Sequence, residues 1–233
     1  MPGGVKRNYV AVRRADTTRQ TRRAVVAAAA ALYLRDGFGR TTVDAVAASA
    51  GVSRKTVFRA VGGKVELLTL AIDWAAAGDD RDVPLAERDA IADLAAQVST
   101  DAIMARWAVL TAAIGSRMAG LSLVLAEAAG ADPAARDLRG RAQMQRHLGA
   151  TAFAEFLAGR GLLRSDVSVN RAADLVWLHS DPSMYRLLVV ERNWSNDEFV
   201  AWLTRTVGTQ LFTPARKQRR RSQPPINGAP DRR

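Results

Sequence analysis

Residues 41–64, TTVDAVAASAGVSRKTVFRAVGGK, constrain the fold of this chain more than any other stretch. They predict two short helices joined by a tight turn at Gly51, because glycine readily adopts the positive φ that such a turn needs. Ala47 is small enough for the two helices to cross closely at a steep angle. The apolar cluster expected to hold that angle consists of Val43, Val46, Val52 and Val57. The pattern indicates a helix-turn-helix unit, with an ordinary helical hairpin as the alternative.

The second helix of this unit opens with hydroxyls and cations that suit DNA. Free N–H groups at a helix N-terminus favour a phosphate, and Arg54 or Lys55 is placed to pair with guanine O6 and N7 in the major groove. Residues flanking this helix are expected to hydrogen-bond backbone phosphates, which sets register rather than sequence. A solvated surface charge is the alternative for each cation. The predicted DNA contacts are Thr41, Thr42, Ser53, Arg54, Lys55, Thr56, Phe58, Arg59 and Lys64.

Charge is distributed unevenly along the 233 residues. Residues 1–70 carry a net charge of +9, residues 71–213 carry −4, and residues 214–233 carry +6, which together give +11. A basic head and tail around a mildly acidic body indicate that only the ends meet a polyanion. A sequence-independent nucleic-acid-binding protein is the alternative, and it would bind random and specific DNA equally.

Composition gives no support for catalysis or for a membrane protein. The chain has no cysteine, and its two histidines, His147 and His179, have neither zinc-binding nor triad-like spacing. No glycine-rich phosphate loop follows a strand. We therefore predict no enzyme, no metal and no cofactor. No apolar run reaches the ~18 residues that span a bilayer, so we expect a cytoplasmic protein without a membrane partner.

The chain predicts an all-α fold with an N-terminal helix-turn-helix domain and a helical C-terminal domain. We expect a flexible basic arm over 1–17, a DNA-binding domain over 18–65, a ligand-binding and dimerisation domain over 66–213, and a disordered basic tail over 214–233. The first helix is expected from Thr17 or Thr18 to Asp36, because threonine is a good N-cap. Further helices are predicted at 43–50, 53–61, 64–77, 86–102, 104–128, 133–159, 170–180, 183–192 and 196–212.

Residues 19–70 resemble the DNA-binding domain of the TetR-type transcriptional regulators. The matching positions are Val25, Ala28, Ala29, Leu32, Tyr33, Gly37-Phe38, Thr42-Val43, Val46-Ala47, Gly51-Val52-Ser53, Phe58, Lys64 and Leu67-Leu68. Segments 181–188 and 192–195 are also similar to some members. The chain departs from the family at Phe58, where tyrosine is usual, at Val61, and at the linker Gly62-Gly63.

The resemblance implies that the helical body binds a small effector and forms a homodimer. The predicted effector site lies on apolar helix faces and indicates a bulky, mainly apolar ligand; core packing is the alternative. Its residues are Met104, Trp107, Leu110, Ile114, Met118, Leu121 and Leu125. The predicted dimer interface has apolar residues at helical spacing, with packing on the chain's own core as the alternative. Its residues are Ala173, Val176, Trp177, Phe199, Leu203, Val207 and Leu211.

We therefore expect a dimeric repressor that binds a two-fold symmetric double-stranded operator. Two heads are needed because one helix-turn-helix reads few base pairs, and they must reach grooves ~34–36 Å apart. The effector is expected to favour a spacing of the heads that does not fit the operator. Activation, in which the effector strengthens DNA binding, is the alternative.

Overall fold

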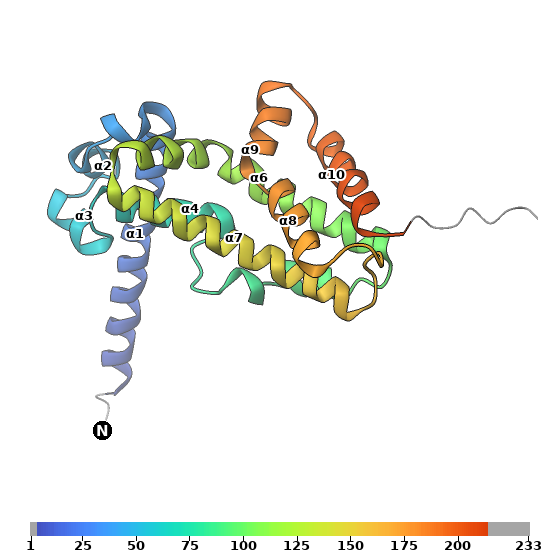
Figure 1. The fold of residues 1–233 in the computed structure, drawn as a ribbon. Coiled ribbons are helices and arrows are strands. Elements are labelled where there is room, and N and C mark those ends of the chain that lie inside the picture. Colours follow the sequence, from blue (N-terminus) through green and yellow to red (C-terminus); the bar gives the residue numbers. More distant parts are fainter. Residues whose placement is uncertain (1–3, 214–233) are drawn as a thin grey trace, which may run out of the picture.

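Helix α6 (Thr100–Ala131) runs through the centre of the molecule and contacts helices from both ends of the chain (Figure 1). The computed structural model describes the backbone of residues 4–213 and the side chains of residues 16–213. Within that part of the chain every regular element is helical, as the sequence predicts. Helix α6 is also long and apolar enough to span a membrane, judged by length and composition alone. Its packing against α1, α4, α7, α9 and α10 is instead that of a core helix.

Four helices form the head of the molecule. They are α1 (Gly4–Arg40), α2 (Val43–Ser49), α3 (Arg54–Ala60) and α4 (Lys64–Ala77). A glycine with positive φ lies between α2 and α3 (Gly51, φ +66°) and another between α3 and α4 (Gly62, φ +128°). A third, Gly78 with φ +90°, follows the end of α4. Such values are strained for residues with a side chain. The predicted bounds of α4 agree with the structure.

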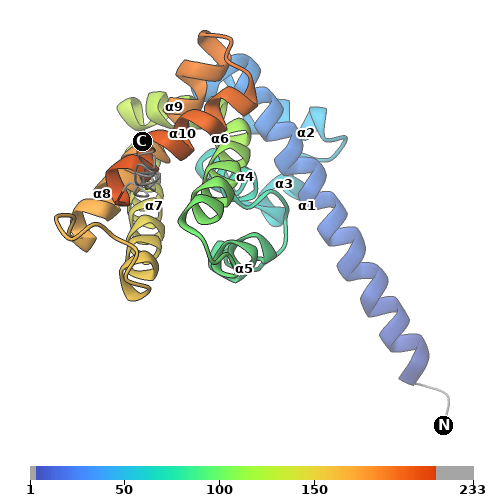
Figure 2. The same ribbon diagram turned by 90° about the vertical axis from the view of Figure 1, so that its right-hand side faces the viewer.

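Helix α1 begins at Gly4, well before the N-cap predicted at Thr17 or Thr18. Figures 1 and 2 show its first turns standing away from the other helices. The helix start expected at Thr17 or Thr18 is therefore wrong, whereas the flexibility of the basic arm over 1–17 stays a prediction. The physical reason is that residues 5–16 contain neither proline nor glycine, so nothing in them stops a helix that has already formed. Residues 1–3 lie outside the described part.

The helix predicted over 86–102 is also wrong. The structure has a short 3₁₀ turn, η1 (Leu85–Glu87), then α5 (Asp89–Ala95), and a break before α6. Ser99 causes the break, because its hydroxyl accepts a hydrogen bond from the Ala102 N–H at 3.2 Å and so caps α6. Helix α6 consequently begins earlier than the predicted residue 104, and it continues to Ala131.

The rest of the body consists of α7 (Pro133–Gly159), α8 (Val169–His179), α9 (Pro182–Tyr185), η2 (Arg186–Glu191) and α10 (Asn196–Leu211). The single helix predicted at 183–192 is divided, because η2 is a π-helical segment in which the Arg192 N–H donates to the Leu187 carbonyl at 3.1 Å. Helix α10 begins with a capping box, in which Ser195 and Glu198 bond each other's backbone N–H groups. The tail at 214–233 lies outside the described residues.

Two hydrophobic cores hold these helices together. The first joins the head to the second half of α6 and the start of α7, through residues such as Tyr33, Leu68, Leu121 and Leu138. The second joins the first half of α6 to α7, α8 and α10, and includes Phe153. The head core is therefore continuous across the boundary expected near residue 65.

Candidate DNA-binding head and effector sites

The turn between α2 and α3 has the geometry that the sequence predicts. Beside Gly51, the Val52 N–H donates to the Ala47 carbonyl at 3.0 Å. Val46 and Val57 are fully buried beneath the turn. This packing fixes the crossing of the two helices, so that the opposite face of α3 is presented at the surface.

Both helices of the unit have side-chain N-caps. The Thr42 hydroxyl accepts a hydrogen bond from the Ala45 N–H at 3.1 Å, and the Ser53 hydroxyl accepts one from the Thr56 N–H at 3.1 Å. The hydroxyls of Ser53 and Thr56 also lie 2.9 Å apart. Thr42 and Ser53 are exposed and Thr56 is half-buried, so these predicted contacts lie at the ends of two helices on one surface.

The outer face of α3 presents Arg54, Lys55, Phe58 and Arg59 to solvent. Arg54 forms an ion pair with Asp44 of α2, in which Nη1 donates to Oδ2 at 2.6 Å. Its guanidinium also lies 5.6 Å from the centre of the Phe58 ring. Among the described residues neither Lys55 nor Arg59 has a carboxylate partner. The face therefore carries two cations without a carboxylate partner, Lys55 and Arg59, and one, Arg54, that is paired with Asp44.

Thr41 does not belong to this surface. Its side chain is buried, with only 1% of the residue exposed, and its hydroxyl donates to the Gly37 carbonyl at 2.9 Å. The prediction that Thr41 contacts a phosphate is corrected, because the hydroxyl closes the end of α1, where Gly37 interrupts the helical geometry.

Lys64 is half-buried and contacts the end of α1. Its ammonium lies 4.3 Å from the centre of the Phe38 ring and 3.3 Å from the Gly39 carbonyl oxygen. Burial lowers the pKa of this ammonium. Lys64 thus links α4 to α1 in the described structure.

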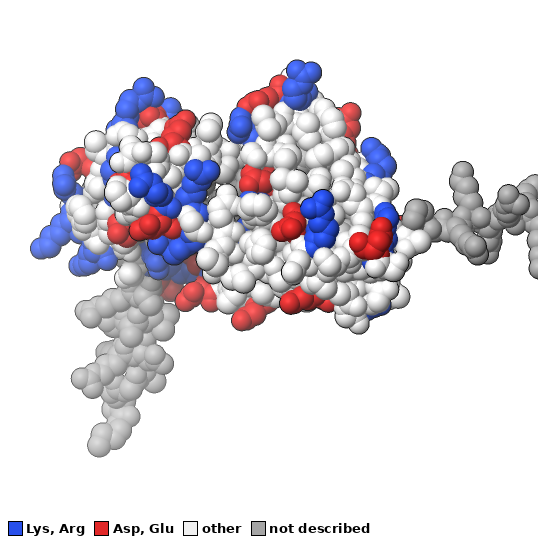
Figure 3. All heavy atoms as spheres, in the orientation of Figure 1, with Lys and Arg blue, Asp and Glu red and all other residues white. Residues whose placement is uncertain are grey.

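Figure 3 shows how the charges are placed on one face of the molecule. Lys and Arg side chains gather on the head, whereas the body carries scattered charges of both signs within a broad uncharged area. The charge division read from the sequence is therefore also a division in space. An anionic partner would meet the head first.

The residues of the predicted effector site do not form one pocket. Met104 and Trp107 are buried in the body core, where the Trp107 and Phe153 rings stack with their centres 6.0 Å apart. Met118, Leu121 and Leu125 are instead buried in the head core, and Ile114 packs against it. Met104 and Leu125 lie roughly 30 Å apart along α6, at about 1.5 Å per residue, so one small molecule cannot touch both. Leu110, which is half-buried, lies between these groups.

A cleft of about 420 Å³ lies elsewhere, between the head and the body. Its walls come from α1, the end of α3, the start of α4 and the start of α7. The lining residues are Arg22, Val61, Val65, Glu66, Thr69, Leu70, Ala134, Asp137 and Arg141. Glu66 also accepts a hydrogen bond from the Gly63 N–H at 2.9 Å, which caps α4. No local pattern in the sequence indicates this cleft, because its residues come from four separate segments.

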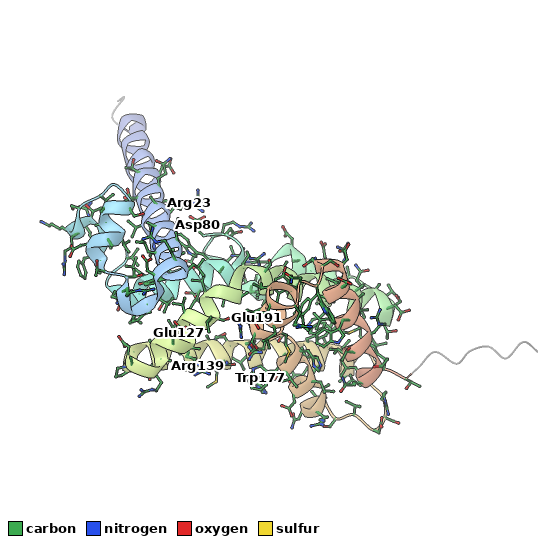
Figure 4. All side chains as sticks on the ribbon, turned by 90° about the horizontal axis from the view of Figure 1, so that it is seen from above. Arg23, Asp80, Glu127, Arg139, Trp177 and Glu191 are labelled. Carbon is green, nitrogen blue, oxygen red and sulfur yellow. The ribbon has the colours of Figure 1, made fainter. Side chains whose placement is uncertain are left out.

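The apolar stripes predicted for a dimer interface face the chain's own core. Phe199, Leu203, Val207 and Leu211 are fully buried against α6, and Ala173 and Val176 are 2% exposed. This prediction is corrected, because an interface needs side chains that a single chain leaves exposed. Trp177 is the partial exception: its half-buried ring lies beside Arg146, and Figure 4 shows it on α8.

Exposed apolar side chains near Trp177 come from α7 and α8. Met144 is 65% exposed, Leu148 54% and Leu178 49%. The two helices pack side by side, and the His147 ring of α7 contacts the Trp177 ring of α8 at 5.9 Å. The spacing of Met144 and Leu148, four residues apart on α7, was the signal that could have found this face.

An all-helical protein with a capped, cationic helix-turn-helix at one end belongs to the class of DNA-binding regulators. A family model described as "Bacterial regulatory proteins, tetR family" matches residues 25–71. The resemblance to the DNA-binding domain of the TetR-type transcriptional regulators is therefore confirmed over residues 25–71. No curated protein sequence matches the chain.

Solved structures share the fold of the whole chain. NalD of Pseudomonas aeruginosa, the secondary repressor of the MexAB-OprM multidrug efflux pump, has 15% identity and a TM-score of 0.64, and the match covers 86% of this chain and 100% of NalD. A proposed transcriptional regulator from Saccharomonospora viridis in complex with choline has 18% identity and a TM-score of 0.62, with 82% and 97% covered. A regulator from Rhodococcus sp. Rha1 has 17% identity and a TM-score of 0.57, with 81% and 94% covered. Identities this low show a shared fold alone.

Proposed function

We propose that the chain is a ligand-responsive repressor that binds a two-fold symmetric operator as a dimer. The observation that carries the DNA-binding part is the exposed outer face of α3, where Arg54 and Lys55 stand at a helix N-terminus capped by Ser53 and Arg59 lies in the last turn. A helix of this kind enters the major groove with its first residues at the base edges. Thr42 at the start of α2 supports this placement by offering a phosphate contact beside it.

Selection of bound sequences from a random DNA pool tests this proposal. A regulator should recover a two-fold symmetric site and prefer it to random DNA by ~10³-fold or more. Equal affinity for both would favour the alternative, a non-specific nucleic-acid-binding protein. A recovered site without symmetry would contradict the dimer but leave specific DNA binding intact.

We place the dimer contact on the exposed face of α7 and α8 in place of the buried stripes. The occupant we propose is a second copy of this chain, because the apolar residues Met144, Leu148 and Leu178 are exposed on two helices that pack side by side and would be covered by an equivalent surface related by two-fold symmetry. Sedimentation equilibrium of Leu148→Glu should give a monomer. Val98→Glu is the matched control, since Val98 is 88% exposed on the loop before α6. A dimeric Leu148→Glu variant would contradict this assignment.

We propose that the effector enters the body core at the Trp107 end of α6. Aromatic rings line ligand sites and also attract organic cations. Here the Phe153 ring stacks on the Trp107 ring and also on the Phe156 ring. Met104 and Leu110 flank this cluster on α6, whereas the predicted residues from Ile114 to Leu125 belong to the head core. The choline complex of one structural neighbour and the repressor role of another make a small effector and repression reasonable for this chain.

The effector releases the dimer from the operator if it binds more tightly to a state in which the two heads do not fit the operator. Choline is the first compound to test, with quenching of tryptophan fluorescence as the readout in the wild type and in Trp107→Phe. Trp202→Phe, altered in another aromatic cluster, is the control. A gel-shift titration in which a bound compound strengthened operator binding would favour an activator instead.

A further inference from the structure

The ion pair between Asp44 and Arg54 crosses the DNA-facing surface of the head. Asp44 lies in the first turn of α2 and Arg54 is the first residue of α3, and the two side chains are 64% and 59% exposed. Arg54 donates to Asp44 through Nη1 alone, and its remaining N–H groups make no other hydrogen bond within the described residues. The guanidinium also lies over the Phe58 ring. Arg54 is thus held by two neighbours yet keeps donors for a third partner.

Holding one arginine in this way matters because DNA offers a cation two kinds of acceptor. Phosphates are present at every position, whereas guanine O6 and N7 occur only at particular base pairs. An unrestrained arginine at this surface reaches either. A carboxylate beside it repels phosphates and orients the guanidinium, and an exposed pair contributes only ~0.2–1 kcal/mol, so it does not prevent contact with a base.

We propose that Asp44 is a specificity-determining residue: it positions Arg54 for a guanine edge and withholds it from backbone phosphates. This inference rests on the proposed function, because it requires that α3 reads a DNA sequence. The neighbouring cations Lys55 and Arg59 have no carboxylate partner among the described residues and supply the unspecific attraction. Asp44 therefore acts through Arg54 and does not itself need to touch DNA.

The test compares the full-length wild type with Asp44→Asn, Asp44→Glu and the control Asp36→Asn. Asp36 belongs to the same head and pairs with Arg35 at 2.7 Å, so its substitution removes the same charge and also breaks an arginine pair. For Asp44→Asn we expect about 3- to 10-fold tighter binding to random duplex DNA, and a slope of log affinity against log salt steeper by about 0.9, which corresponds to one added phosphate contact. We also expect relaxed preference at one base position of the selected site. Asp44→Glu, which can keep the pair, should resemble the wild type.

A double mutant separates positioning from direct repulsion between Asp44 and DNA. In an Arg54→Ala background, Asp44→Asn should change neither the random-DNA affinity nor the salt slope, because the residue through which it acts is gone. An equal gain in both backgrounds, or an equal gain in Asp36→Asn, would overturn the inference in favour of a general charge effect.

Two results distinguish this inference from the proposed function. A wild type that selects no site overturns the proposed function and this inference together. A wild type that selects a site, with Asp44→Asn selecting the same site at the same stringency, overturns this inference alone. Thermal melting of each variant shows that the comparison concerns folded protein.

Discussion

Asp80, in the loop after α4, accepts hydrogen bonds from Arg19 of α1 through both carboxylate oxygens, each at 2.9 Å. Arg23, one turn further along α1, donates to the same carboxylate, and Figure 4 shows the two side chains facing each other. The Asp80 side chain is only 7% exposed, whereas each arginine is about half exposed. The first helix of the head is thus fastened to the loop that leads into the body.

The loop that carries Asp80 is itself held from inside. Arg88, 7% exposed, donates to the carbonyls of Val83 and Arg81, both at 3.2 Å, and to the Asp79 carboxylate at 2.8 Å. Arg117 of α6 closes the end of α4 by donating to the Ala75 carbonyl at 2.6 Å. Guanidinium groups therefore satisfy backbone carbonyls that the end of a helix leaves open.

The pH dependence of stability should report these carboxylates. The Arg81 backbone N–H, followed by Arg88, lowers the pKa of Asp79 to about 2, and hydrogen bonds from Arg23 and Arg19 lower the pKa of Asp80. A carboxylate with a lowered folded pKa stabilises the protein above its unfolded pKa of ~3.9, and that contribution is lost as pH falls toward the folded value. We expect the difference in Tm between wild type and Asp80→Asn to be full at pH 7 and to shrink below about pH 4.

Asp82→Asn is the control for this experiment, because Asp82 lies in the same loop and has no ion pair among the described residues. Circular dichroism melts over the pH range 2 to 7 provide the measurement. If the Tm difference between wild type and Asp80→Asn stayed constant throughout that range, the arginine contacts would not explain the stability.

Two glycines of α6 should respond differently to alanine. A Cβ at Gly115 would lie 2.8 Å from the Tyr185 Cβ, which cannot rotate away because it is attached to the backbone of α9. We expect Gly115→Ala to destabilise the fold by about 1–3 kcal/mol through overpacking. A Cβ at Gly120 would meet only the tip of Leu34, whose side chain is 55% exposed and can turn aside.

Gly120→Ala should therefore be neutral or stabilising by up to ~1 kcal/mol, since alanine is the better helix former. Urea unfolding of the two variants measures both effects. A loss of stability in Gly120→Ala as large as that in Gly115→Ala would mean that Leu34 is fixed against α6.

The substitution Phe58→Tyr should tighten DNA binding. Phe58 is 48% exposed on the outer face of α3, so an added hydroxyl needs no repacking. A hydrogen bond to a charged phosphate contributes roughly 1.5–3 kcal/mol, and we expect at least a 5-fold gain in operator affinity at unchanged Tm. Fluorescence anisotropy gives the affinity. Unchanged binding would indicate that the ring does not face the DNA backbone.

Substitution of a buried leucine on α10 should lower the stability of the fold, whereas substitution of an exposed leucine on α8 should weaken the proposed dimer. Leu203→Ala removes a fully buried side chain and should cost about 2–5 kcal/mol of unfolding free energy. Leu178→Ala, at a site 49% exposed, should leave the unfolding of a dilute monomer nearly unchanged but weaken the proposed dimer. Chemical denaturation at several protein concentrations distinguishes the two. If the unfolding midpoint depended strongly on protein concentration in Leu203→Ala alone, the dimer interface would lie on α10 instead.

The helix bounds and the turn that could be predicted from the sequence rest on local signals. The bounds of α4 follow from Gly63 and Gly78, which interrupt the helix on either side, and the turn at Gly51 has a conformation that glycine adopts at low cost. The break before α6 was missed because the Ala- and Leu-rich pattern continues through it, and a serine N-cap is a weaker signal than a glycine.

Contacts between segments that are far apart in the chain could not be predicted from local sequence patterns. The four-residue spacing of Phe199, Leu203, Val207 and Leu211 identifies an apolar face but not the surface that covers it, which here belongs to α6. Periodicity on α6 likewise marks one stripe, although its two ends lie in different cores. Arg19 and Asp80 are 61 residues apart, and no local pattern pairs them.

The core that joins the head to α6 limits how this protein can be recombined. Met118, Leu121 and Leu125 fill the same apolar interior as Tyr33 and Leu68. A chimeric regulator made by exchanging heads at residue 65 would place a foreign first helix against these side chains and leave mismatched volumes at the seam. Successful exchange must carry the second half of α6 and the first turns of α7 along with the head, so the smallest portable unit is larger than the DNA-reading motif.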